Sequence, residues 1–264
     1  MDADLLGIIV TAIQVIVLLV LVYGMVGHIK NSKVDLPAIL FMFSMFSFLL
    51  NDIYWLCFDI LYSGEKMPFS VNAIGEYAFM MLLVSMYKQL FDSYKLRISL
   101  ENMIITVMTA IYMCLWIRWS GTWTGNIIGA VAFGYLVCII VGLMIEYEPI
   151  PAKYLYYIMY IAIAQLMLNL MAEFVTSGAV TATVNNVMYA VTYVPALIFL
   201  AIITLRIIKK ADNKGNLILT GGFLVWSFNA MYMSGDYWYE LGDALSTIAT
   251  VYLYIEMKRE GEKI

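Results

Sequence analysis

Long apolar stretches recur along the whole chain and are separated by short polar breaks. A helix that crosses the hydrocarbon core of a bilayer needs about 20 mostly apolar residues. Nine segments meet this requirement: 5–26, 38–62, 70–90, 102–119, 125–145, 154–175, 183–207, 217–234 and 239–257. The sequence therefore predicts an all-α, polytopic integral membrane protein with nine transmembrane helices.

The breaks between these segments are short and rich in residues that end helices, as in 64–68, 146–151 and 209–214. None is long enough for a soluble domain, so residues 1–264 are expected to form a single transmembrane domain. Asp2 and Asp4 precede the first segment where a signal peptide has Lys or Arg, and its apolar run is longer than a signal peptide needs. We therefore expect a retained first helix with the N-terminus outside.

The basic residues predict the orientation, because the cytoplasmic loops of membrane proteins carry an excess of Lys and Arg. With the N-terminus outside, thirteen of the fifteen basic residues fall on the cytoplasmic side. These are Lys30, Lys33, Lys88, Lys95, Arg97, Lys153, Arg206, Lys209, Lys210, Lys214, Lys258, Arg259 and Lys263. Only Lys66 and Arg118 fall outside. This bias predicts a cytoplasmic C-terminus.

Two short patterns recur along the chain. Asn-Asp-Ile-Tyr at 51–54 is echoed at 109–112, 169–172 and 229–232, with spacings of 58, 60 and 60 residues. Asn-x-Ile-Gly at 72–75 recurs at 126–129, with weaker copies at 186–190 and 239–243. Apolar sequence can produce such matches by chance, but two patterns in register favour duplication. The predicted architecture is one leading helix, about 5–26, and four parallel tandem hairpins at about 38–90, 102–145, 154–207 and 217–257.

Composition agrees with a chain that lies in a bilayer. Apolar side chains make up 63% of the residues and charged ones 13%, and the mean hydropathy is +0.86. Soluble domains are about half apolar and a quarter charged, so an ordinary soluble domain is excluded. The net charge of -4 and the pI near 5.0 give no indication of nucleic-acid binding. The expected location is the cytoplasmic membrane of a bacterium or an archaeon.

Polar and ionisable side chains gather in the outer halves of the predicted helices. Such residues are costly in hydrocarbon and usually face the interior of a helix bundle. The candidate ligand-binding residues are Asn51, Asp52, Tyr54, Asp59, Asn72, Glu76, Asn169, Glu173, Asn229, Tyr232, Asp236 and Asp243. Asp52 is the strongest functional candidate, because a carboxyl at that depth needs a partner or a proton.

Structural roles compete with this interpretation. Acidic residues in the first turn of a helix, such as Glu240, are favoured there by the helix dipole. Asparagines within the spans, such as Asn51 and Asn169, can form hydrogen bonds between helices as readily as they can line a cavity. Most tryptophans, including Trp116, lie near the predicted outer boundary, where their rings settle in an interfacial belt.

Few residues suit metal or nucleophilic chemistry. His28 is the only histidine, and the three cysteines are spread over three segments. Neither set has the spacing of a metal site, so no metal and no cofactor is expected. No Ser–His pair can form near the outer polar residues, which argues against a serine hydrolase. Enzymatic activity is therefore left uncertain and receives less weight than binding.

Three functions fit this pattern. The first is a transporter or sensor whose acidic pocket, open to the extracytoplasmic side, binds a small solute that is cationic or carries an amine. The second is an intramembrane enzyme for a lipid or lipid-linked substrate, with Asp236, Glu240 and Asp243 supplying paired carboxylates as general acid and base. The third is an assembly subunit without a ligand. A sensor would also need a cytoplasmic or membrane protein partner, for which the basic inner loops offer a docking place.

Overall fold

The computed structural model of the chain describes residues 3–261 except 32–34, 63–68, 93, 121–122, 149–150, 176–186, 188, 192, 196, 199–200, 203–204, 206–217, 219 and 223–236. Within these residues the protein is helical and contains no strand. Seven helices have defined bounds: α1 (Ala3–Asn31), α2 (Leu36–Leu61), α3 (Phe69–Leu90), α4 (Leu100–Ser120), α5 (Thr124–Tyr147), α6 (Ala152–Val175) and α9 (Tyr237–Gly261).

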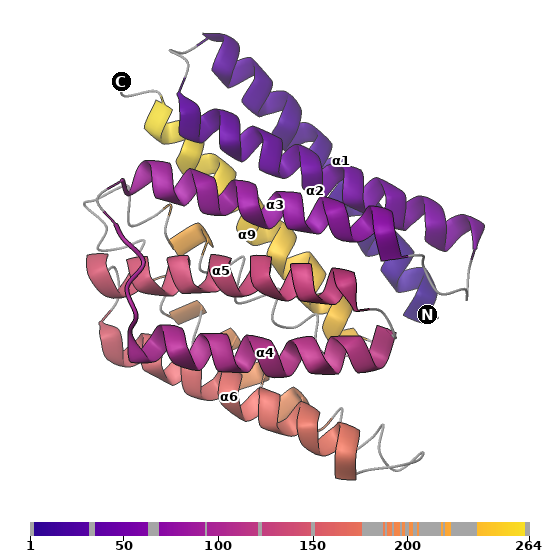
Figure 1. The fold of residues 1–264 in the computed structure, drawn as a ribbon. Helices are drawn as coiled ribbons and strands as arrows, with labels where there is room; N and C mark the ends of the chain where they lie inside the picture. The colour runs from indigo at the N-terminus through magenta and orange to yellow at the C-terminus, as the bar shows by residue number, and fades with distance from the viewer. Residues whose placement is uncertain are drawn as a thin grey trace.

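The helices pack side by side with alternating direction (Figure 1). Helices α1, α3, α5 and α9 run one way, and α2, α4 and α6 run the other way. Helix α2 lies between α1 and α3, α5 contacts both α3 and α4, and α6 contacts α4 and α5. Helix α9 crosses behind this row and contacts α1 and α2, so the last described helix closes against the first.

Each of the seven helices covers one segment predicted from the sequence, and most extend past its ends. Helix α1, for example, continues five residues beyond the predicted end at Val26. The helices extend past the predicted ends because backbone hydrogen bonds can continue a helix beyond the last of its apolar residues. The predicted segments 183–207 and 217–234 fall largely outside the described residues, although the described positions between 187 and 205 are helical.

Five of the described helices are long and apolar enough to cross a membrane: α1, α2, α4, α5 and α6. Helices α3 and α9 have 22 and 25 residues, which correspond to about 33 and 38 Å at 1.5 Å per residue. Both therefore also match the thickness of a hydrocarbon core, about 30 Å. These observations indicate a membrane protein.

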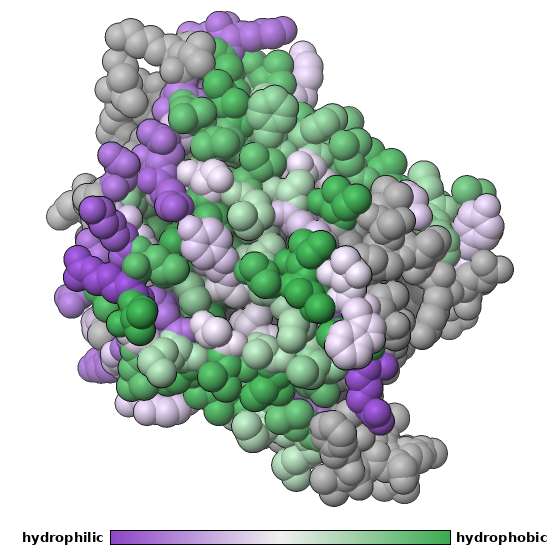
Figure 2. Space-filling view, in the orientation of Figure 1, coloured by the Kyte–Doolittle hydropathy of each residue, from purple (hydrophilic) through white to green (hydrophobic). Residues whose placement is uncertain are grey.

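The surface agrees with this conclusion. Apolar residues cover the middle of the helices, and hydrophilic residues gather at the left end of the view (Figure 2). That end carries the exposed basic residues Lys30, Lys88, Lys95, Arg97, Lys153, Lys258 and Arg259. Helix α1 exposes Ile13, Ile16, Leu19 and Val20 by 55 to 62% each. A continuous apolar face of this kind suits lipid and would promote aggregation of a protein in water.

The core lies where α2, α3 and α5 meet. Helix α5 is apolar on all sides, and its residues 136–141 are all buried, as are Leu143 and Met144. Helix α3 contributes Leu83, Met86 and Tyr87, none more than 1% exposed. These residues pack tightly in the half of the bundle that is predicted to be cytoplasmic.

Polar contacts join the helices at a few buried points. Ser44 in α2 donates a hydrogen bond of 3.0 Å to the carbonyl of Phe79 in α3, and the hydroxyl of Tyr87 donates one of 3.1 Å to the carbonyl of Ile218. Gln14 in α1 donates from Nε2 to Oγ1 of Thr247 in α9, over 2.9 Å. This last bond connects the first and last described helices.

We expect the Gln14–Thr247 hydrogen bond to stabilise the contact between α1 and α9. In a double-mutant cycle with Gln14→Leu and Thr247→Val, the coupling free energy should be about 0.6–1.7 kcal/mol, the range of hydrogen bonds between membrane helices. The measurement is unfolding of the purified variants in mixed micelles. Additive effects of the two substitutions would show that this bond does not hold the helices together.

Candidate ligand-binding site

A partly open cavity of about 280 Å³ lies at the end of the bundle opposite the basic residues. It is formed where α2 and α4 end and where α3, α5 and α9 begin. Its volume is just below the range of about 300–1,000 Å³ of small-molecule pockets. The residues that line it are Phe48, Trp55, Glu76, Tyr77, Phe79, Met80, Trp116, Asn126, Gly129, Phe133 and Tyr239.

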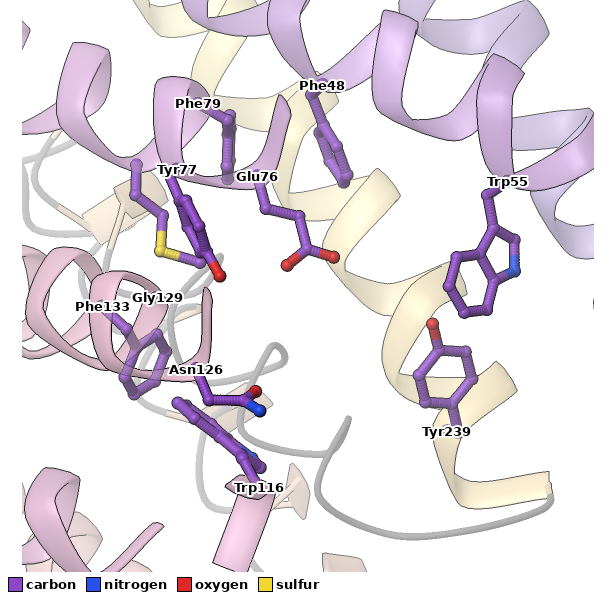
Figure 3. Close-up of a pocket in the computed structure, with 11 residues that line it drawn as sticks. Phe48, Trp55, Glu76, Tyr77, Phe79, Trp116, Asn126, Gly129, Phe133 and Tyr239 are labelled. Carbon is purple, nitrogen blue, oxygen red and sulfur yellow. The ribbon is translucent and has the colours of Figure 1, made fainter. Parts of the chain in front are cut away.

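Glu76 is the one charged residue among these eleven. Its side chain projects from the first half of α3 into the space between the surrounding rings (Figure 3). Tyr77 and Phe133 lie on one side of it in this view, and Trp55 and Tyr239 lie on the other. The carboxyl of Glu76 is therefore surrounded by aromatic side chains that come from several helices.

Local packing fixes these side chains. Tyr77 donates a hydrogen bond from its hydroxyl to the carbonyl of Gly125, which joins α3 to the start of α5. Phe79 stacks on Phe48, with ring centroids 4.6 Å apart and planes inclined by 29°. Trp116 packs against Phe133, with centroids 6.2 Å apart in an edge-to-face arrangement. Aromatic pairs of these geometries are stabilising beyond their burial, so the wall of the cavity is preorganised.

Two further carboxyls, which do not line the cavity, interact electrostatically at this end of the bundle. Asp52 in α2 is within electrostatic range of Asp243 in α9 and of Glu76. Both aspartates are buried, with exposed fractions of 4% and 6%. Tyr239 lies among them, within electrostatic range of all three carboxyls. Three acidic groups from α2, α3 and α9 therefore meet at this end of the bundle.

The hydrogen bonds of Asp52 are incomplete. Its Oδ1 accepts a bond of 3.2 Å from the side-chain amide of Asn51. Its Oδ2 and the Oδ1 of Asn51 are buried and have no hydrogen-bond partner in the described part of the chain. Each unpaired buried polar atom costs about 1–3 kcal/mol, and such groups in native proteins often serve a functional purpose.

Asp59 and Glu240 lie nearer the ends of α2 and α9, and Glu240 is electrostatically connected to the other acidic groups. Glu240 is within electrostatic range of Asp59 and Asp243. Its carboxyl lies against Gly7 of α1, where a methyl group on Gly7 would approach Oε1 to 2.8 Å. Glu240 also occupies the first turn of α9, as the helix-dipole interpretation expects. Tyr54 is half-buried in α2 and does not line the cavity.

Asn169 takes part in a different arrangement. Its Oδ1 accepts a hydrogen bond of 2.8 Å from Tyr189, and its Nδ2 lies 3.5 Å from the hydroxyl of Tyr112. The side chain is 2% exposed. Asn169 thus connects α6 to α4 and to the helical residues near 189, so its contacts favour the structural role over the lining of a cavity.

Because Asn169 joins three helical segments, we expect Asn169→Ala to lower the free energy of unfolding by about 1–2 kcal/mol, mainly by leaving the tyrosine hydroxyls without their partner. Denaturation of the purified variant measures this loss. Met171→Ala is the matched control, since Met171 lies on the same helix and is 50% exposed. An equal loss in both variants would contradict a specific role for Asn169.

The remaining candidates are not placed. Asn229, Tyr232 and Asp236 lie outside the described residues. Asn72 and Glu173 belong to α3 and α6, but their side chains also lie outside what the structure describes. The proposed grouping of all these residues in one pocket therefore stays a prediction.

Several residues of the cavity were missing from the sequence-based set. Trp55 follows Tyr54 directly, and the spacing of Phe48, Asp52 and Trp55 at intervals of four and three residues places them on one helix face. Asn126 occupies the repeat position of Asn72. Trp116 was assigned to an interfacial belt, whereas its ring lines the cavity. Helical spacing and the repeat could have found Trp55 and Asn126; only packing reveals Trp116.

The chemistry of the lining residues limits what the cavity can hold. Among the described residues no group of three or more His, Cys, Asp or Glu side chains is placed to hold a metal ion. The eleven lining residues offer one carboxyl, one amide and two phenol groups beside an apolar, mostly aromatic wall. Such a wall excludes water, and in that surrounding a single charge on the ligand interacts strongly with Glu76.

Comparisons with known protein families, with curated proteins and with solved structures find no match for this chain. Arguments about its function therefore start from the geometry and chemistry of the site.

Proposed function

We propose that the protein is a nine-helix membrane protein that binds a small organic cation from the extracytoplasmic side, as a transporter or a sensor in the cytoplasmic membrane of a bacterium or an archaeon. The observation that carries the proposal is the cavity in which the Glu76 carboxyl lies among aromatic rings, at the end of the bundle opposite the basic residues. A carboxyl in such a site favours a ligand of positive charge.

The direction of α9 agrees with an odd number of helices, as in the nine that the sequence predicts. Helix α9 runs antiparallel to α6 (Figure 1), so residues 176–236 between them would cross the membrane an even number of times. The predicted segments 183–207 and 217–234 supply two crossings. The contacts between α2 and α3 and between α4 and α5 agree with the first two proposed hairpins. Basic residues at the other end agree with a cytoplasmic location of that end.

The packed half of the bundle bears on the choice between transport and sensing. Met86, Tyr87 and Leu143 are completely buried on the side away from the cavity. A transporter has to open its site to this side as well, which requires these contacts to separate. A sensor needs only a smaller change that reaches a protein partner. Counterflow of a bound solute in proteoliposomes distinguishes the two functions, because only a transporter exchanges solute across the bilayer.

Thermal unfolding of the purified full-length protein tests the binding proposal. The panel consists of amines, methylated ammonium salts, amino acids, nucleosides and neutral analogues of the amines, each titrated in maltoside micelles. A compound that binds the folded state raises the melting temperature with concentration. We expect organic cations to do so and their neutral analogues not to do so.

Substitution of Glu76 tests whether a ligand that raises the melting temperature binds in the cavity. We expect Glu76→Gln to weaken binding by at least about tenfold, because the amide keeps the shape of the side chain but removes its charge. Asp92→Asn is the matched control, since Asp92 is exposed in the turn after α3 and should leave the affinity unchanged. If no compound shifts the wild type, the protein is better described as an assembly subunit.

The nearness of Asp52 and Asp243 also supports one alternative. Two carboxyls within electrostatic range of each other, with a third acidic group nearby, offer the residue types of general acid–base catalysis on a lipid or lipid-linked substrate. Incubation of the protein with defined phospholipids in micelles, followed by analysis of the products, tests this alternative. Turnover that disappears in both Asp52→Asn and Asp243→Asn would replace the binding proposal.

A further inference from the structure

We propose that the cavity recognises a quaternary or otherwise fully substituted ammonium group in preference to a primary amine. The inference rests on the proposed function, since it assigns the chemical class of the cation that enters this site. The step is carried by the aromatic content of the wall, because seven of the eleven lining residues are Phe, Tyr or Trp.

The hydrogen-bonding groups of the wall are few. A primary ammonium has three N–H donors, each of which needs an acceptor when it leaves water. The wall offers the Glu76 carboxylate, the Asn126 amide oxygen and two phenol oxygens. Tyr77 donates its hydroxyl proton to the carbonyl of Gly125, which fixes the direction in which its oxygen can accept. A quaternary ammonium has no N–H group, so it enters the same wall without this requirement.

The aromatic rings of the wall can attract a quaternary ammonium ion through their faces. The face of an aromatic ring attracts a cation within about 6 Å of its centre, most strongly when the ring is Trp, and cages of such rings bind quaternary ammonium ligands. Here Trp55 from α2 and Tyr239 from α9 lie together on one side of Glu76, and Trp116 from α4 lies below it in the view of Figure 3. Methyl groups on the nitrogen would fill the apolar space between these rings.

Because the Glu76 carboxyl faces the cavity, the cavity should prefer a cation over a neutral apolar molecule. Figure 3 shows its oxygens directed into the space that the rings enclose. An uncharged ligand would gain nothing from the charge of this carboxyl. A substituted ammonium offers a diffuse positive charge and an apolar surface together, so it matches both features of the wall.

The same chemical group occurs free in solution and on the headgroup of a lipid such as phosphatidylcholine. A cavity at the end of a membrane helix bundle could be reached from either source. The shared chemistry is the substituted ammonium, and the experiment below includes one arm for each source.

The test compares choline with two matched probes by calorimetric titration of the full-length protein in maltoside micelles. Ethanolamine has the same skeleton with a primary ammonium, and 3,3-dimethylbutan-1-ol has the same shape without charge. We expect choline to bind at least about tenfold more tightly than either probe. Equal or tighter binding of ethanolamine would overturn the inference and leave the proposed function intact, and equal binding of the neutral alcohol would overturn both.

A ring substitution tests the wall directly. Trp55→Leu keeps an apolar side chain and removes the aromatic face, so we expect it to weaken choline binding by about 3- to 30-fold and to change ethanolamine binding little. Trp123→Leu is the matched control, because Trp123 is 68% exposed and does not line the cavity. The melting temperature of each unliganded variant verifies that it is folded. If Trp116→Leu and Trp55→Leu both leave choline affinity unchanged while folded, the aromatic recognition is wrong.

Measurements in nanodiscs distinguish a free solute from a lipid headgroup as the source of the substituted ammonium. In discs of phosphatidylglycerol, free choline should bind as in micelles. If discs of phosphatidylcholine raise the melting temperature and compete with added choline, the ligand is a lipid headgroup; if they do not compete, it is a free solute. Either result supports the inference, whereas absence of choline binding in both discs and micelles overturns it.

Discussion

Gly75→Leu should lower the melting temperature by several degrees and abolish the response to ligand. A Cβ atom at Gly75 would lie 2.9 Å from Cβ of Asn51 and 3.3 Å from the carbonyl oxygen of Ser47. The backbones of α2 and α3 therefore approach each other closely at this point. A larger side chain has to separate the two helices, and overpacking of this kind costs about 1–3 kcal/mol or more. The same separation displaces Asp52 and Glu76, which flank the contact.

The graded series Gly75→Ala and Gly75→Leu is best measured beside Gly27→Ala and Gly27→Leu. No atom lies within 4 Å of the position that a Cβ would take at Gly27 in α1. Alanine should stabilise a helix by about 1 kcal/mol relative to glycine where space is free. We therefore expect opposite signs for the two alanine variants in thermal unfolding. If Gly75→Leu is as stable as Gly27→Leu, then α2 and α3 do not approach as described.

Asp52→Asn should raise the thermal stability of the protein. In the wild type the carboxyl of Asp52 lies within electrostatic range of Asp243 and Glu76, and one of its oxygens is buried without a partner. The amide has nearly the same shape and carries no charge, so the repulsion among the three acidic groups decreases. Replacing poorly compensated buried charges stabilises proteins by about 1–4 kcal/mol.

For a chain of this length, 1 kcal/mol corresponds to a shift of about 2–4 °C, so we expect the melting temperature to rise by about 3–10 °C at alkaline pH, where the three carboxyls of the wild type are ionised. Asp92→Asn, at an exposed turn, should leave it unchanged. A functional site that reduces the stability of the fold commonly behaves in this manner. A lower melting temperature of Asp52→Asn would instead indicate that the carboxyl stabilises the contacts among α2, α3 and α9.

The candidate site was only partly predictable. Polar residues stand out in apolar sequence because each is costly in hydrocarbon, so Asp52, Glu76 and Asp243 were found without a structure. Their companions were harder to find. Aromatic residues are common throughout this chain, at 15% of all positions, and Trp116 at the predicted boundary fits a lipid interface as well as a pocket. Nothing in its local sequence separates the two roles.

Asn169 shows the opposite limit. The repeat predicts the same role for Asn169 as for Asn51, since both residues begin a copy of the same pattern. In the structure Asn51 lies beside the carboxyl cluster, whereas Asn169 is bonded to Tyr189 and lies near Tyr112. A repeat preserves the position of a residue within its own helix, but the neighbours of that helix differ between the middle and the edge of a bundle.

The sequence by itself determined that the chain is helical and suited to a bilayer. The length of an apolar run and the distribution of charge are local properties of the sequence, and they act on insertion and orientation in a membrane without any tertiary contact. The sequence also placed the costly polar residues at one end of the helices. Only the tertiary structure decided which of them meet. Packing of α2 against α3 and α9 brings residues 76 and 243 within electrostatic range of residue 52. This packing depends on the rotation and order of the helices, which close approach at points such as Gly75 determines.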